Sequence, residues 1–363
     1  MAATNEVREV NEEVRAIDRE LEELLKKQSA RVKVVGVGGA GNNTVTRMRE
    51  VGIKGGEIIA INTDAQDLLY TNADQKILIG KEISRGLGAG SNPRIGMEAA
   101  KESMQEIKKK LEGADMIFIT CGLGGGTGTG AAPVVAEIAK KMGALTIGIV
   151  TLPFTVEGRK RIENAMEGLE KMEGLVDTLI IIPNDKLLEL APDLPLTTAF
   201  KVADEILTNA VKGMTELVTK SGLVNLDFAD VRAIMANGGV SLIGMGESDS
   251  NNRAIEAVEK AINNPLLDVD ITNASGALVN VIGGEDLSLE EYKQVIEFLG
   301  EKLSPDARMI SGAQISKDLE GIVRVMVIVT GVNSPQMVGQ KRNFESQKQD
   351  QMSEELGIEF MEE

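Results

Sequence analysis

The stretch at positions 121–133, CGLGGGTGTGAAP, constrains this chain more than any other. It follows the apolar run MIFITCG (116–122), precedes a helical pattern, and holds six glycines and two threonines between positions 122 and 130. Such a loop can place backbone N–H groups and hydroxyls around phosphate oxygens, with a helix dipole behind them. The motif GxxxxGK[ST] is missing from the sequence. The pattern therefore predicts a phosphate site that is not a P-loop.

A second glycine-rich turn, GVGGAGNN at 36–43, also follows an apolar run and leads into a helical stretch that we expect to begin near Asn42. It satisfies GxGxxG, in which glycines allow the backbone to approach phosphate closely. Alone the signal is weak, because a dinucleotide dehydrogenase or a simple tight turn would show it too. The paired amides of Asn42 and Asn43 favour contact with a base or ribose.

Short β-branched runs alternate with helical patterns from position 31 onward: VKVVGV, EIIAIN, KILIG, MIFITCG, LTIGIVT and TLIIIP. Runs that are apolar on both sides indicate strands buried on both faces, as in a parallel sheet covered by helices. Ligands then belong at the carboxyl ends of the strands, where both glycine loops fall. The fold class predicted is α/β.

Five segments follow from these patterns. They are an amphipathic helix at 1–30, a nucleotide domain at 31–195, a long apolar central helix at 196–222, a smaller α+β domain at 223–332 and a polar tail at 333–363. The first segment either packs on its own domain or self-associates.

Composition narrows the chemistry further. The chain has 363 residues, a net charge of −17, 2% aromatic residues, one cysteine and no histidine. A histidine-based triad and histidine metal ligands are excluded, so chemistry must use carboxylates, amides, dipoles and cations. The acidic charge makes nucleic acid an unlikely partner. With no signal peptide and no run of about 20 apolar residues, we expect a cytoplasmic protein without direct membrane insertion.

Several motifs together resemble the tubulin superfamily: GGGTGTG followed by AAP, GVGGAGNN, AINTDAQ, GLGAGSNP, TLPFTVEGRKR, AFKVADEIL and NLDFADVR. They are more similar to the FtsZ branch, in its archaeal form, than to eukaryotic tubulin, and they cover about residues 31–332. The resemblance implies a Rossmann-like GTPase domain, a long central helix and a smaller α+β C-terminal domain. It also implies binding of GTP and GDP with Mg²⁺, the metal ligands being unknown.

The resemblance carries a set of nucleotide contacts onto this sequence. Among them, Phe200 would stack on guanine, and the Asp204 carboxylate would accept two N–H donors from the guanine edge. Two alternatives stay open: Phe200 could be a core residue, and Glu157 with Arg161 could be a solvated ion pair. The implied contacts are Gly39, Ala40, Gly41, Asn42, Asn43, Ala65, Gly90, Gly124, Gly125, Gly126, Thr127, Gly128, Thr129, Glu157, Arg161, Phe200 and Asp204.

The motif NLDFADV supplies candidate catalytic residues, Asn225, Asp227 and Asp230. In FtsZ-like proteins this loop enters the nucleotide pocket of the neighbouring subunit, where the carboxylates orient water against the γ-phosphate. The resemblance thus implies a head-to-tail homopolymer whose GTPase activity is stimulated by assembly, forming the division ring at midcell. A helix-capping role for the aspartates is the simpler alternative.

The sequence ends in LGIEFMEE, which regains apolar residues after the polar tail. The resemblance implies that this motif docks with a membrane adaptor such as SepF; a tail without a partner is the alternative. Two other functions stay in view for the whole chain. A nicotinamide-dependent oxidoreductase leaves GGGTGTG and NLDFADV without a role, and a non-hydrolysing scaffold regulated by GTP should lack the acidic pair.

Overall fold

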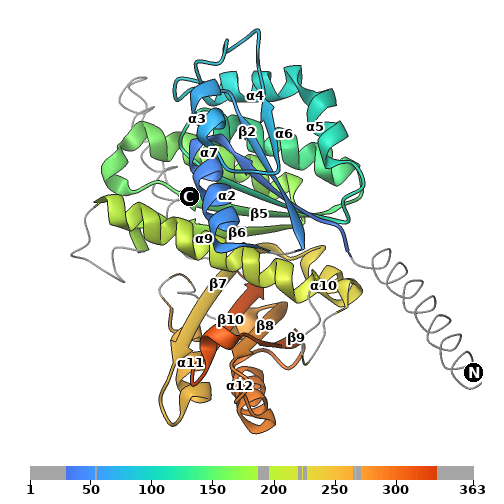
Figure 1. Cartoon of the computed structure of the whole chain (residues 1–363), viewed down its shortest axis with the longest axis vertical. Helices are drawn as coiled ribbons and strands as arrows, with labels where there is room; N and C mark the ends of the chain where they lie inside the picture. Colours follow the sequence, from blue (N-terminus) through green and yellow to red (C-terminus); the bar gives the residue numbers. More distant parts are fainter. Residues whose placement is uncertain are drawn as a thin grey trace, which may run out of the picture.

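The computed structural model describes residues 30–53, 55–186, 196–219, 223, 227–264, 266 and 271–332, without the side chains of residues 196, 197, 199, 200, 203 and 273 (Figure 1). Three expectations therefore lie outside the described residues. They are the amphipathic helix of residues 1–30, the tail with its terminal motif at 333–363, and the role of Asn225.

The first half of the chain is a six-stranded parallel sheet in the order β3-β2-β1-β4-β5-β6, covered by helices on both faces. Its elements are β1 (Val32–Val37), α2 (Gly38–Val51), β2 (Gly56–Asn62), α3 (Ala65–Tyr70), β3 (Gln75–Leu78), α4 (Pro93–Glu102), α5 (Met104–Leu111), β4 (Met116–Gly122), α6 (Thr127–Lys141), β5 (Leu145–Leu152), η1 (Thr155–Glu157), α7 (Arg159–Leu175) and β6 (Thr178–Pro183).

Alternate strand residues enter different cores. On one face Val35 and Ile119 pack with residues of α4, α5, α6 and α7. On the other face Val34 and Phe118 pack with residues of α2 and α9 (Leu196–Thr219). Because strands with two buried faces need apolar residues at every position, this arrangement accounts for the continuous apolar runs in the sequence. The predicted α/β class with a parallel sheet is confirmed.

The second half of the chain follows α9, the long helix that crosses between the upper and lower parts of the molecule in Figure 1. Its elements are α10 (Phe228–Met235), β7 (Gly239–Ser248), α11 (Arg253–Ile262), η2 (Ile271–Asn273), β8 (Gly276–Gly283), α12 (Leu289–Lys302), β9 (Arg308–Ile315), η3 (Lys317–Leu319) and β10 (Val323–Thr330). Helices α11 and α12 pack on one face of these strands. The opposite face meets α9.

The two halves share one continuous sheet, which the sequence did not predict. The first residues of β6, Thr178–Ile180, pair in parallel with Gly239–Ser241 of β7. Strand β10 then pairs antiparallel with β7 and β8, and β8 pairs in parallel with β9, so ten strands form a single sheet. A short parallel pairing between segments more than 60 positions apart leaves no local signal in a sequence.

One expected boundary was wrong: α2 begins at Gly38, four residues before Asn42. Its first turn is therefore made of glycines and alanine. An added Cβ at Gly36 would meet the carbonyl oxygen of Gly41 at 2.4 Å, and one at Gly41 would meet that of Thr120 at 2.5 Å. These close backbone approaches explain why the helix starts within a glycine run that propensity alone would assign to a loop.

Candidate functional site

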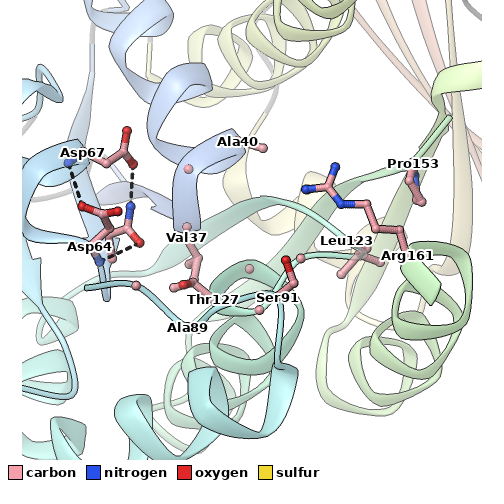
Figure 2. A pocket seen from close by; sticks show the side chains of 18 of the residues that line it. Val37, Ala40, Asp64, Asp67, Ala89, Ser91, Leu123, Thr127, Pro153 and Arg161 are labelled. Atoms are coloured by element: carbon pink, nitrogen blue, oxygen red, sulfur yellow. Dashed lines mark hydrogen bonds between the residues drawn. The ribbon is translucent and has the colours of Figure 1, made fainter. Parts of the chain in front are cut away.

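A cavity of about 560 Å³ opens where the strands of the parallel sheet end. Its lining comes from the carboxyl ends of β2, β4, β5 and β6, from the starts of α2 and α6, from the loop at 87–91 and from α9. Figure 2 shows Asp64 and Asp67 on one side of this cavity and Arg161 on the other, with Ala40 and Thr127 between them. The parallel sheet thus brings loops that are far apart in the sequence to a single site.

The two glycine loops press against each other at the floor of the cavity. Gly38 has φ +74°, and a Cβ on it would lie 2.7 Å from the backbone nitrogen of Gly128. Helices α2 and α6 both start here, so their free N–H groups and positive dipole ends face the same space. Two helix N-termini converging on one cavity make an anion site suited to a polyphosphate.

Replacing Gly38 with alanine is expected to lower the free energy of unfolding by about 1–3 kcal/mol and to weaken nucleotide binding at least about tenfold. Alanine would be strained in the left-handed backbone conformation that Gly38 adopts, and its methyl group would push the two loops apart. Gly52→Ala is a matched control, because Gly52 also has φ +74° but has nothing within 4 Å of its added Cβ. Thermal melts and titration of a fluorescent nucleotide check the difference; equal effects in both variants would rule out loop contact as the cause.

The loop at 85–91 has an uncommon backbone conformation. It lies beside the glycine-rich loop at 122–130, which we call the phosphate loop. Arg85 and Ser91 have φ values of +53° and +58°, which L-residues rarely adopt. Asn164 of α7 donates its amide to the carbonyl oxygens of both Ser91 and Gly124, each at 3.3 Å. A single buried amide therefore ties this loop to the phosphate loop, so displacement of either loop is transmitted to the other.

Asp204 comes from α9 and faces α2 across the cavity. The hydroxyl of Thr44 donates to its Oδ1 at 3.1 Å. Burial raises the pKa of the Asp204 carboxyl, while the Thr44 hydroxyl and the charge of Arg47 pull the pKa back down. A mostly buried carboxylate with a single neutral donor has spare acceptor capacity, so it is suited to a ligand that brings further N–H groups.

A network around Asp67 was missed at the sequence level. The amides of Asn62 and Asn42 both donate to Asp67 Oδ2, at 2.5 and 3.3 Å. Burial raises the pKa of this carboxyl, and the nearby charge of Asp64 adds to the rise. Asp64 caps α3 by accepting from the backbone nitrogens of Gln66 and Asp67. The one available signal was that AINTDAQ follows directly after a strand, at the ligand edge of the sheet.

Asn184 was also missed. It follows β6, lines the cavity and is 5% exposed, yet its Oδ1 has no hydrogen-bond partner among the described residues. A buried acceptor without a donor is unfavourable, and a bound ligand with an N–H or O–H group would supply the donor. Its position immediately after the run TLIIIP was the signal that could have found it.

Comparisons with known proteins identify this architecture. Residues 31–192 match the GTPase domain of the Tubulin/FtsZ family, and residues 239–333 match the C-terminal domain of the FtsZ family. Cell division protein FtsZ 1 of Thermococcus kodakarensis is 63% identical over 325 residues, 90% of this chain and 87% of that protein. The chain belongs to the FtsZ family.

Two further comparisons agree with this membership. FtsZ 1 of Methanocaldococcus jannaschii is 59% identical over 331 residues, which are 91% of each chain. The solved structure titled as an empty FtsZ dimer from M. jannaschii superimposes with a TM-score of 0.84 at 60% identity, covering 87% of this chain and 92% of that one. The chain is thus a cell division protein of the tubulin/FtsZ GTPase family, and the expected two-domain FtsZ fold is confirmed.

Not all of the nucleotide contacts expected for an FtsZ protein lie on the cavity wall. One expected contact, Phe200, is on α9, but its side chain lies outside the described residues. The expected residues that line the cavity are Gly39, Ala40, Gly90, Gly125, Gly126, Thr127, Gly128, Glu157, Arg161 and Asp204. Those that do not are Gly41, Asn42, Asn43, Ala65, Gly124 and Thr129.

The residues off the cavity wall still have contacts that explain their place in the FtsZ motifs. Thr129 Oγ1 accepts from the backbone nitrogen of Gly124 at 2.9 Å, which fixes the phosphate loop from inside. Asn43 lines a smaller hollow beside Arg47 and Asp204, adjacent to the main cavity. Glu157 and Arg161 form an ion pair with each other, so both the pairing alternative and a place on the cavity wall hold for them.

The acidic pair of the FtsZ-like loop lies near the amino ends of the parallel strands, whereas the cavity lies at their carboxyl ends. Asp227 is the N-cap of α10, and its side chain accepts from the backbone nitrogen of Ala229. From Asp204, α9 continues to Thr219, a rise of about 22 Å at roughly 1.5 Å per residue, before the chain reaches Asp227. Helix α10 itself contacts Gly143, just before β5 begins. Asp227 and Asp230 are therefore not part of the cavity of their own chain.

Cys121 is buried beneath the phosphate loop. Burial raises the pKa of its thiol to about 12, so the thiol stays protonated at neutral pH and is not a nucleophile. An added Cβ on Gly128 would lie 3.4 Å from the Cβ of Cys121, so the site has room only for a small side chain. The role that the structure gives Cys121 is packing. Within the part of the chain that is described, no helix is long and apolar enough to cross a membrane.

Proposed function

We propose that this FtsZ-family protein binds GTP in the cavity and hydrolyses it only when a second copy completes the site. One observation supports this most directly: the nucleotide cavity lies at the carboxyl ends of the parallel strands, and the acidic pair lies near their amino ends. A chain cannot bring Asp227 to its own phosphates, but a copy stacked head-to-tail can. Such a contact is heterologous, and it produces open filaments when the rotation between copies does not close a ring. The empty FtsZ dimer from M. jannaschii is a relative that assembles.

In this proposal each part of GTP meets a different wall of the cavity. The backbone N–H groups of Gly39, Ala40 and Gly126–Gly128 hold the phosphates, supported by two helix dipoles. Asp204 accepts the N1–H and amino N–H of guanine, and adenine, which lacks both donors in that arrangement, leaves its carboxylate without partners. The buried Oδ1 of Asn184 accepts a hydrogen bond from an N–H or O–H group of the nucleotide. Arg161 exchanges its ion pair with Glu157 for a phosphate or ribose oxygen.

The chemical step then depends on positioning. Asp227 and Asp230 of the incoming copy accept a hydrogen bond from a water molecule and hold it in line with the γ-phosphorus. Both side chains are exposed in the single chain, as groups that act in a neighbour must be. No covalent intermediate is required, which is consistent with a sequence without histidine. Loss of the phosphate weakens the contact between copies and releases subunits.

Mg²⁺ fits the donor set of this cavity. Among the described residues, the charged side chains that line the cavity are Asp64, Asp67, Glu157 and Asp204 and the cation Arg161, an acidic surface for a ligand that is itself polyanionic. Carboxylates and phosphate oxygens are the ligands that Mg²⁺ prefers, and it is commonly held by one or two carboxylates plus phosphates. Asp67, 3.8 Å from the position of a Cβ on Gly39, is the carboxylate placed to hold it. The ion would neutralise charge on the phosphates.

Phosphate release from GTP with Mg²⁺, measured against protein concentration, tests the shared site. We expect activity per molecule to rise steeply above a threshold concentration, because each completed site needs two copies. Light scattering on the same samples should rise at the same threshold. Constant activity per molecule down to dilute protein would mean that one chain holds the complete site.

The remaining proposals concern the cellular role. Because its relatives are cell division proteins, we propose that the filaments form the division ring at midcell. We also propose that LGIEFMEE, outside the described residues, binds a membrane adaptor such as SepF. A non-hydrolysing scaffold is the second candidate; hydrolysis would exclude it. Family membership leaves the oxidoreductase without support.

A further inference from the structure

Arg232 connects the helix of the acidic pair to the helix of the phosphate loop. It lies on α10, and its guanidinium donates to the carbonyl oxygen of Gly143 at 2.9 Å. Gly143 comes two residues after the last residue of α6, the helix that begins at Thr127 in the phosphate loop. Helix α6 therefore has phosphate-binding N–H groups at one end and an arginine at the other. A cation at a helix C-terminus satisfies free carbonyls and is favoured by the helix dipole.

The same guanidinium packs on the first turn of α10. Its carbon lies 5.9 Å from the ring centroid of Phe228, the residue that follows Asp227 and packs against the core. The pKa of Asp115, just before β4, is lowered chiefly by the hydrogen bond from Arg31, and the charge of Arg232 adds to this lowering. A planar guanidinium can stack on a ring and donate to a carbonyl at once, whereas an ammonium group has no face to stack. Arg232 thus restrains the turn that carries the two aspartates.

The rest of α10 is also held near the amino ends of the parallel strands. Thr178, the first residue of β6, donates its hydroxyl to the carbonyl oxygen of Met235 at 2.5 Å. Val231, Ile234 and Met235 are buried in the core that also holds Leu145 of β5. These contacts hold the C-terminal end of α10. Arg232 itself is in the last turn of α10, but its guanidinium reaches back over Phe228 in the first turn while it donates to Gly143 of the nucleotide domain.

We propose that Arg232 is a positioning residue for GTP hydrolysis in the neighbouring subunit: it anchors the first turn of α10 to the end of α6 and so aims Asp227 and Asp230. The proposal rests on the shared site proposed above. Arg232 touches neither nucleotide nor water in this account. Its effect should therefore appear in turnover within filaments and not in nucleotide binding by single chains.

Arg232→Ala is the first test. At saturating GTP and Mg²⁺, we expect turnover per assembled subunit to fall about tenfold or more, because small misplacements of reacting groups have large kinetic effects. GTP affinity of dilute protein should stay within twofold of wild type. Arg232→Lys should recover part of the turnover, since it keeps the charge but loses the stacking. Lys293→Ala, which removes an exposed cation paired with Glu297 on α12, is the matched control and should change nothing.

Mixed filaments show in which subunit Arg232 acts. Arg232→Ala chains, with intact pockets, are mixed with Asp204→Asn chains, which have altered pockets but an intact α10, and GTP hydrolysis is followed. Turnover should exceed the sum of the two proteins measured separately. Unchanged turnover in Arg232→Ala alone, a loss that follows GTP affinity, or failure to assemble would each overturn the proposal.

The shared site and the role of Arg232 can fail separately. An Asp227→Ala chain mixed with the same Asp204→Asn partner reports on the shared site alone. If that mixture recovers activity and the Arg232→Ala mixture does not, Arg232 acts on its own pocket and only the present inference is wrong. If neither mixture recovers activity, the shared site itself is wrong.

Discussion

Asp227→Ala is expected to bind GTP as tightly as the wild-type protein and to release phosphate about 10²-fold more slowly, or slower still, once assembled. Binding should be intact because Asp227, the N-cap of α10, lies near the amino ends of the strands, away from the cavity at their carboxyl ends. Turnover should fall because the variant leaves only Asp230 of the two proposed carboxylates to orient the water in the next subunit. Nucleotide titration of dilute protein and phosphate release above the assembly threshold measure the two effects.

Asp318→Ala is a matched control for this variant, because Asp318 is an exposed aspartate in η3 that belongs neither to α10 nor to the nucleotide cavity. It should keep wild-type turnover. The helix-capping alternative predicts something different: loss of the cap at Asp227 would lower the melting temperature without a selective loss of turnover. Asp227→Asn separates the two, since asparagine still caps a helix but carries no charge. Wild-type turnover in Asp227→Asn would contradict a catalytic role for the carboxylate.

Asp204→Asn is expected to change the base that the cavity prefers, from guanine to xanthine. A carboxylate accepts two N–H groups from guanine, whereas a side-chain amide accepts one N–H and donates to one oxygen, which is the pattern on xanthine. A mismatched bidentate pair is unfavourable by about 1–3 kcal/mol, so GTP affinity should fall by about 10- to 100-fold and XTP affinity should rise correspondingly. Competition of GTP and XTP against a fluorescent nucleotide gives both values.

The same variant should change the pH dependence of binding. Burial raises the pKa of Asp204, and the groups that face it are the Thr44 hydroxyl and the charge of Arg47. As the pH falls through this raised pKa, the carboxyl gains a proton and loses acceptor capacity, so GTP affinity of the wild-type protein should decline. Asp204→Asn has no such proton and should lack this part of the decline. Unchanged GTP preference in Asp204→Asn would place the base elsewhere.

Strands and their order of appearance could be predicted from the sequence because their physical cause is local. A run such as MIFITCG at β4 is apolar at every buried position except Thr120, since both faces of the strand are buried. The glycine loops were equally legible, because only glycine tolerates the approach of Gly38 to Gly128. What these loops bind came from the resemblance of several motifs, which the family comparison then supported.

Other parts of the site had no local cause and could not be predicted. The network of Asn42, Asn62 and Asp67 joins three elements, and each of its residues alone has the appearance of an ordinary polar loop residue. The start of α2 at Gly38 was missed because tertiary packing overrides the low helix propensity of glycine.

By itself, the sequence determined the α/β class and the positions of the two glycine-rich loops, because strand patterns and residue type carry that information directly. The roles proposed for the loops and for the acidic pair rest on the resemblance to the FtsZ family. The tertiary structure decided where these parts stand relative to one another. In a parallel sheet all carboxyl ends of the strands lie on one side and all amino ends on the other. The fold places the phosphate loops at the carboxyl ends and α10 near the amino ends. The contact of Arg232 with Gly143 and the pairing of β6 with β7 belong to this arrangement, and neither could be predicted because each joins residues more than 50 positions apart.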